Sequence, residues 1–219
     1  MIVKKQLYKT HSNLLLQSGK TLENIVLAYE YYGDLNSEAS NAILIFHALT
    51  SNNHIAGKYA EDDSKPGWWD VAVGPGKAID TNLFFVVCVN VIGGSNGSTG
   101  PASINSQTNK SYALDFPIVT IRDMARATKF VIDYLKIYKL YAVIGGCFGG
   151  FLVMEWLISF PEFTKKSIII GATPSTNAYS IALWETLRQA IYIDTNFNKG
   201  QYYNSSYPKK GMGLGRLVG

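Results

Sequence analysis

A glycine-rich segment with a central cysteine constrains the fold of this chain most strongly. It reads Gly-Gly-Cys-Phe-Gly-Gly at positions 145–150, after the apolar run 141–144 and before the apolar helical stretch 151–160. Small residues around a central nucleophile, between a strand and a helix, are typical of a nucleophile elbow, a turn too tight for large neighbours. The pattern predicts that Cys147 is exposed at a strained backbone position. The alternative interpretation is a glycine-rich turn that carries a buried cysteine.

The setting of Cys147 favours nucleophilic chemistry. The predicted helix begins beside it, so unpaired N–H groups and the positive end of the helix dipole lie near the sulfur. Such surroundings favour the thiolate of a cysteine, which is its nucleophilic form. In elbow sites the oxyanion is bound by the backbone N–H of the residue after the nucleophile and by one from a loop after an earlier strand. We expect these groups to be the backbone N–H of Phe148 and, after the strand at 42–46, that of Leu49 or its neighbour.

A base and an acid must complete such a site. Their usual chain order is nucleophile, carboxylate, histidine, but the three histidines all precede Cys147, at His11, His47 and His54. Either the chain stops before the acid and base, or an earlier histidine serves, as in a Cys147–His47 pair that hydrolyses esters. We expect His47, directly after the strand at 42–46, to shape its loop instead. We expect His54 to be a loop residue without a role in proton transfer.

The pattern along the chain predicts an α/β fold with a mostly parallel sheet. Continuous apolar runs at 42–46 and 83–91 are typical of strands covered on both faces. A helix from Thr120, capped with Asp123 in a capping box, and the elbow segment follow. A strand at 167–171, a helix at 180–193 and a polar tail at 196–219 complete the chain. This alternation of strands and helices is typical of α/β proteins.

The sequence also predicts an N-terminal hairpin and two long loops. The runs 14–16 and 25–31, separated by Gln-Ser-Gly-Lys, predict an N-terminal hairpin over residues 14–31. The long segments 50–82, with Trp-Trp in its middle, and 93–117 are loops of a length that is usually functional.

The composition fits one globular domain over residues 1–219. Hydrophobic residues make up 47% and charged residues 16% of the chain, and the net charge is only +4. Without a Lys/Arg run we expect no nucleic-acid partner. Without an apolar signal core or a long apolar span we expect no membrane segment. Cys88, inside an apolar run, is predicted to be buried, and two cysteines make no disulfide framework. These features predict a soluble protein of a reducing compartment.

Several motifs, in order along the whole chain, resemble those of the homoserine O-acetyltransferase family. Beside the elbow they are FHALT at 46–50, KPGWWD at 65–70, GPGK at 74–77, NVIGG at 90–94, GSTGP at 97–101, DFP at 115–117, TIRDM at 120–124 and RQAI at 188–191. The resemblance implies an α/β-hydrolase fold and a cytoplasmic acyltransferase of methionine biosynthesis. Its donor would be acetyl-CoA, or succinyl-CoA as in close relatives, and its acceptor L-homoserine. It implies no bound cofactor, no metal and a homodimer.

The resemblance also assigns individual residues. Cys147 occupies the nucleophile position, where most of the family has serine, and Arg216 aligns with an arginine that binds the substrate carboxylate. For Arg188 we favour a buried structural ion pair over a substrate-binding role. The catalytic Asp and His of the family match no residue here. Residues 196–219 correspond to the start of the helical lid, so we expect a fold truncated before the lid and the last strands.

The expected truncation leaves the strand at 167–171 as a bare sheet edge with uncovered apolar surface. We therefore expect the isolated chain to be marginally stable or sticky. It also leaves a second hypothesis, a catalytically inactive homologue or interaction module without acid and base.

Overall fold

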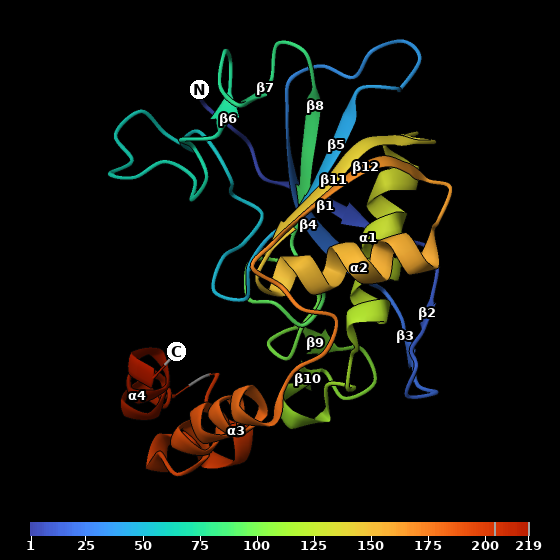
Figure 1. Cartoon of the computed structure of the whole chain (residues 1–219). Coiled ribbons are helices and arrows are strands. Elements are labelled where there is room, and N and C mark those ends of the chain that lie inside the picture. Colours follow the sequence, from blue (N-terminus) through green and yellow to red (C-terminus); the bar gives the residue numbers. More distant parts are fainter. Residues whose placement is uncertain (204, 219) are drawn as a thin grey trace. The chain divides into compact units, whose positions relative to one another are not determined.

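The computed structural model describes residues 1–203 and 205–218 (Figure 1). The chain forms two compact units. The first unit comprises Met1–Thr99 and Ile118–Ala172, and the second comprises Gly100–Pro117 and the described part of Thr173–Gly219.

A six-stranded sheet forms the centre of the first unit, in the order β1-β4-β8-β5-β11-β12. β4 is antiparallel to both β1 and β8, whereas β8, β5, β11 and β12 run parallel to one another. The α/β fold and the mostly parallel sheet are therefore confirmed. The strands are β1 (Gln6–Lys9), β4 (Val26–Tyr32), β5 (Ala42–Phe46), β8 (Phe85–Val89), β11 (Leu140–Gly146) and β12 (Thr164–Ile170).

The central strands are buried on both faces, as their continuous apolar sequences predict. Every residue of β5 and β8 is buried, including Cys88. At the edge of the sheet β12 is different: Ile168 and its two successors are between 41% and 49% exposed. In the described chain β12 pairs with β11 alone, so the prediction of an uncovered apolar edge is confirmed.

Helices α1 (Ile121–Tyr134) and α2 (Phe148–Ser159) lie side by side against one face of the sheet (Figure 1). Thr120 and Asp123 form the predicted capping box of α1, each side chain bonding the backbone of the other. In α2 the buried Trp156 meets Phe46 of β5 edge to face, with ring centroids 5.9 Å apart. The other face of the sheet packs against residues of the loop 50–82, among them Ile55 and Val73.

The predicted hairpin over residues 14–31 is wrong in its pairing. Residues 14–15 (β2, Leu14–Leu15) pair with β3 (Thr21–Leu22), and β4 pairs instead with β1 and β8. The turn at residues 17–20 thus closes a hairpin whose second strand is only two residues long. The longer strand β4 joins the main sheet, where all but one of its last six side chains are buried.

The long loops contain small elements that were not predicted. The loop 50–82 holds the short parallel pair β6 (Val73–Gly74) and β7 (Ile79–Asp80). In the second unit, β9 (Ile104–Asn105) and β10 (Lys110–Ser111) form an antiparallel pair, followed by the 3-10 helix η1 (Ala113–Asp115).

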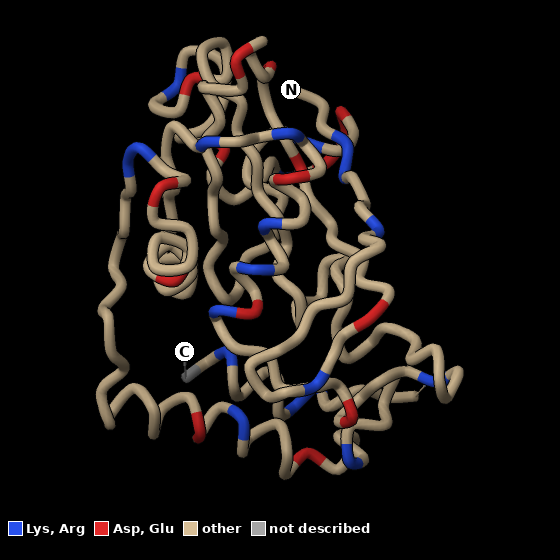
Figure 2. The backbone as a smooth tube through the Cα atoms, turned by 90° about the vertical axis from the view of Figure 1, so that its right-hand side faces the viewer, with Lys and Arg blue, Asp and Glu red and all other residues tan. Residues whose placement is uncertain are grey.

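The second unit also contains α3 (Ala178–Tyr192), the 3-10 helix η2 (Thr195–Gly200) and α4 (Lys209–Val218). The helix predicted at 180–193 is confirmed as α3, but the expected polar tail contains α4, which packs on α3. Figure 2 shows basic and acidic residues scattered along the chain, and α3 carries one of each, Glu185 and Arg188, which lie one helical turn apart. Among the described residues, no helix combines the length and apolar character needed to cross a bilayer.

Candidate active site

Cys147 has the geometry that the elbow prediction requires. It is exposed, it is the N-cap of α2, and its backbone has φ 54° and ψ −120°. A residue with a side chain rarely adopts such a positive φ, because its Cβ crowds the neighbouring backbone. The backbone N–H of Cys147 donates to the carbonyl of Ile170 in β12 at 2.9 Å, which holds the turn at the sheet edge. The prediction of an exposed, strained Cys147 is confirmed, and the buried alternative is wrong.

Two glycines of the elbow are required by close approach. A Cβ at Gly149 would overlap the carbonyl oxygen of Phe46, at the end of β5, and would lie 3.0 Å from that of His47. A Cβ at Gly145 would overlap the carbonyl of Gly149. The first turn of α2 therefore sits directly on the carboxyl end of β5, the edge at which α/β proteins assemble their sites.

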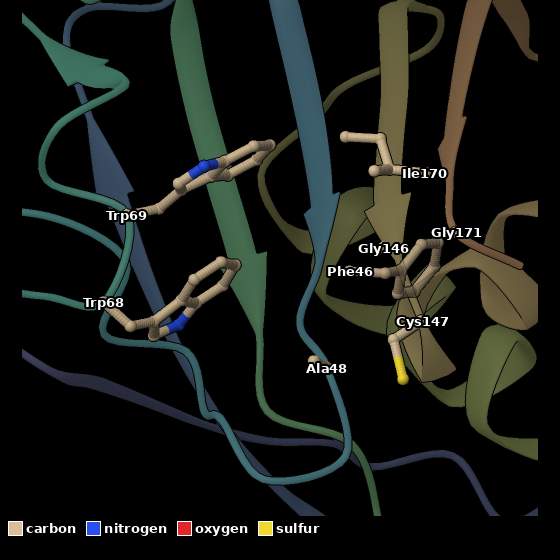
Figure 3. A pocket seen from close by; sticks show the side chains of 8 residues that line it. All are labelled: Phe46, Ala48, Trp68, Trp69, Gly146, Cys147, Ile170 and Gly171. Atoms are coloured by element: carbon tan, nitrogen blue, oxygen red, sulfur yellow. The ribbon is translucent and has the colours of Figure 1, made fainter.

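An apolar cavity of about 390 Å³ opens beside Cys147 (Figure 3). Trp68 and Trp69 form one wall, with their rings stacked 5.5 Å apart and 12° from parallel. The elbow residue Cys147 lies across from them (Figure 3). The remaining lining residues are Phe46, Ala48, Gly146, Ile170 and Gly171. A cavity of this kind can hold a small acyl group next to the sulfur.

The Trp pair was not predicted as part of the site. The sequence signal existed, because two adjacent tryptophans lie in the middle of a long loop. Nothing local, however, indicates that residues 68 and 69 fold back to the sulfur at residue 147.

The groups predicted for the oxyanion hole both lie at this edge of the sheet. Phe148 is the first residue of α2, so its N–H has no intrahelical acceptor. The N–H of Leu49 donates no hydrogen bond within the part of the chain that the structure describes. Their role in binding an oxyanion stays a prediction.

His47 is buried and both of its ring nitrogens are engaged. Nε2 accepts from the N–H of Val91 at 3.3 Å, so Nδ1 carries the proton and donates to the carbonyl of Ala48 at 2.9 Å. Burial lowers the pKa of His47, which keeps the ring neutral. The expectation that His47 shapes its loop is thus supported. A Cys147–His47 pair finds no unengaged ring nitrogen in this arrangement.

The other predicted residues lie elsewhere in the fold. Arg188 pairs with Glu185 as expected, but its side chain is 65% exposed, so the prediction of a buried pair is wrong on that point. Arg216 is an exposed residue in the last turn of α4, in the second unit, and its role stays a prediction. His54 contacts the buried carboxylate of Glu30 at 2.9 Å.

Neither a metal centre nor an acid–base pair is found at the cavity in residues 1–203 and 205–218. No group of three or more His, Cys, Asp or Glu side chains there is arranged to hold a metal ion. The described lining of the cavity includes no His, Asp or Glu. Its only nucleophilic side chain is Cys147.

Comparison with known proteins agrees with this geometry. Residues 41–219 match the family described as alpha/beta hydrolase fold. A homoserine O-acetyltransferase of Methanohalobium evestigatum is 51% identical over 217 residues, which cover 99% of this chain and 44% of that protein. The crystal structure of a homoserine O-acetyltransferase from Bacillus anthracis superposes with a TM-score of 0.94 at 35% identity, covering 100% of this chain and 60% of that one.

The structure of an esterase is equally similar, with a TM-score of 0.93 at 37% identity over 99% of this chain and 60% of that one. The chain spans about half the length of the curated relatives it matches, between 44% and 59%. It belongs to the α/β-hydrolase fold family, and within that family it is similar over its whole length to proteins named homoserine O-acetyltransferase.

Proposed function

We propose that this chain carries the nucleophile of an acyltransferase that moves an acyl group from acyl-CoA to the hydroxyl of L-homoserine. The observation that supports it is the placement of Cys147, exposed on a strained turn, at the first turn of α2 and at the wall of an apolar cavity. The names of the relatives support homoserine as acceptor and acetyl as the transferred group.

The proposed reaction has two steps. The thiolate of Cys147 attacks the carbonyl carbon of acetyl-CoA, the bond from that carbon to the CoA sulfur breaks, and CoA leaves after taking up a proton. The homoserine hydroxyl then attacks the thioester on Cys147 and gives up its proton, and the bond to Sγ breaks to regenerate the thiolate. The N–H groups of Leu49 and Phe148 would stabilise the oxyanion in both steps.

The apolar lining supports acetyl-CoA over succinyl-CoA as donor. A terminal carboxylate against Trp68, Trp69 and Ile170 would give up part of its hydration in a lining that offers it no charged partner, which is costly. We assign the homoserine carboxylate to Arg216, whose guanidinium can bind it with two parallel hydrogen bonds. The base and acid for the proton transfers are proposed to come from outside this chain, and the product to enter methionine biosynthesis in the cytoplasm.

Ester hydrolysis is the second candidate, favoured by the similarity to an esterase structure. It passes through the same acyl-enzyme, formed from an ester with loss of its alcohol, and the acceptor would be water. Once the acyl-enzyme has formed, the two functions are separated by the second step alone.

The experiment measures the intact mass of the chain after incubation with acetyl-CoA at about pH 9, where an ordinary thiol is largely ionised and a base is not needed. We expect one acetyl group on wild type and on Cys88→Ala, and none on Cys147→Ala. Homoserine should then remove the acetyl group faster than buffer does; equal rates would favour the esterase. Absence of the adduct from wild type, or its presence in Cys147→Ala, would overturn the proposal.

A further inference from the structure

Glu30, in β4, is a buried carboxylate that the proposed reaction does not use. Its side chain is fully buried and accepts four hydrogen bonds. Oε1 accepts from Asn53 Nδ2 at 3.0 Å and from the Tyr59 hydroxyl at 2.7 Å. Oε2 accepts from the Tyr32 hydroxyl at 2.7 Å and faces His54 Nδ1 at 2.9 Å. A buried carboxylate is strongly unfavourable unless donors surround it, so four donors on one group mark a specific arrangement.

This Glu30 cluster (Glu30, Tyr32, Asn53, His54, Tyr59) attaches the loop 50–82 to the sheet. Three of its four donors belong to that loop. The Tyr32 hydroxyl also accepts from the backbone N–H groups of residues 55 and 56, at 3.1 and 3.3 Å. Burial raises the pKa of both tyrosines, and the hydrogen bonds to the carboxylate raise it further, so each hydroxyl keeps its proton. The cluster thereby fixes the backbone of residues 53–56.

The same backbone segment holds the Trp pair. The N–H of Trp69 donates to the carbonyl of Ile55 at 2.7 Å, and that of Trp68 to the carbonyl of His54 at 3.3 Å. Trp68 Nε1 donates to the carbonyl of Asn52 at 2.8 Å. Both indoles line the cavity across from Cys147 (Figure 3). Hydrogen bonds on both sides of the backbone segment 52–56 therefore link Glu30 to the cavity wall.

We propose that Glu30 is a positioning residue that sets the place of the Trp68–Trp69 wall and so limits the length of the acyl chain that Cys147 accepts. The inference rests on the proposed function, because it requires an acyl group in the cavity. With the indoles fixed, an acetyl group lies within the cavity beside the sulfur, whereas a longer chain must extend toward the indoles and fit against them. With the indoles displaced, the discrimination between the two weakens.

The test uses Glu30→Gln, which keeps the shape of the side chain but removes its charge and turns an amide N–H₂ toward two of the four donors. The matched control is Asp123→Asn, which alters an equally buried carboxylate that bonds Thr120 and the N–H of Gln17 and does not line the cavity. A merely structural role of Glu30 would make the two variants behave alike.

The measurement is the rate at which p-nitrophenyl acetate and p-nitrophenyl hexanoate acylate Cys147 in the full chain, followed by intact mass. We expect the acetyl-to-hexanoyl rate ratio to fall about tenfold in Glu30→Gln, since pocket contacts with single methylenes carry discrimination of this order. The ratio should stay at the wild-type value in Asp123→Asn. Tryptophan emission should shift in the first variant only, while the rate of iodoacetamide alkylation of Cys147 stays unchanged in both.

A wild-type ratio in Glu30→Gln would overturn the inference. Absence of acylation in wild type would instead overturn the proposed function, so the two failures are distinguishable. If Glu30→Gln does not fold, Tyr59→Phe serves, because it removes one donor at the partly exposed end of the cluster. It should lower the ratio in the same direction by a smaller factor, and an unchanged ratio there also contradicts the inference.

Discussion

Replacing Cys147 by glycine should stabilise the fold relative to replacing it by alanine. Alanine keeps the Cβ that crowds the backbone at φ 54° and ψ −120°, whereas glycine removes it. Because the cysteine side chain is exposed, neither substitution loses much packing. The comparison of the two variants therefore isolates the strain of the elbow from the chemistry of the sulfur.

The expected size follows from two opposing contributions. A side chain in this sparsely populated backbone region costs about 1–3 kcal/mol. Glycine gives back about 0.5–1 kcal/mol, because it loses more conformational freedom on folding than alanine. The net difference in unfolding free energy is about 0–2.5 kcal/mol in favour of the glycine variant. In a chain of this size that corresponds to a rise of up to about 10 °C in the melting temperature.

Urea unfolding followed by circular dichroism measures this difference. The control is the same pair of substitutions at Ile158, an exposed residue in the last turn of α2 with ordinary helical geometry. There glycine should be less stable than alanine by up to about 1 kcal/mol. The reasoning is refuted if glycine is also the less stable substitution at position 147, because the Cβ there would then not destabilise the folded backbone.

Three other outcomes are expected. Gly149→Ala places a methyl group against the end of β5 and should lower the unfolding free energy by about 1–3 kcal/mol. The control is Gly213→Ala in α4, where a Cβ would meet nothing within 4 Å, and this variant should raise the unfolding free energy by up to about 1 kcal/mol. Because burial lowers the pKa of His47, the unfolded chain binds its proton more readily, so the unfolding free energy should fall as the pH drops below about 6.5. Urea titrations from about pH 5 to 8 should show that the unfolding free energy falls less in His47→Gln than in wild type. An equal fall in both would mean that His47 does not cause this pH dependence. Ile168→Lys, on the exposed edge strand, should reduce light scattering at high protein concentration, and unchanged scattering would mean that this edge does not cause association.

Local sequence signals were sufficient wherever a feature depends on neighbours in the chain. The capping box at Thr120 and Asp123 marks the start of α1 because both partners lie within one turn. The continuous apolar run at 42–46 identifies a doubly covered strand. The elbow was predictable because close packing at Gly149 demands a residue without a side chain.

Features that depend on distant partners could not be read in the same way. The pairing of β4 with β8 joins residues more than fifty positions apart, while the turn at 17–20 favoured a local hairpin. Two adjacent tryptophans stand out in the sequence and Glu30 does not, but only the folded loop brings the Trp pair to Cys147 and surrounds Glu30 with donors. Glycines at 211, 213 and 215 obscured α4, whose contacts with α3 offset their low helix propensity.

The geometry of the elbow explains why position 147 can hold a cysteine, although the family resemblance implies a serine there in most members. The turn restricts the residues on either side, since Gly145 and Gly149 have no room for a Cβ, but it leaves the central side chain exposed. Serine and cysteine differ there by one atom that touches little of the protein, so the exchange is nearly neutral for folding. Its consequences fall on reactivity: a thiolate forms more readily than an alkoxide, and in the proposed reaction it would carry the acyl group as a thioester. Cys147→Ser should therefore keep the unfolding free energy within about 0.5 kcal/mol, as for other exposed substitutions, while acylation by acetyl-CoA without an added base falls sharply. A serine variant that is acylated as fast as wild type would show that the sulfur contributes nothing specific to the site.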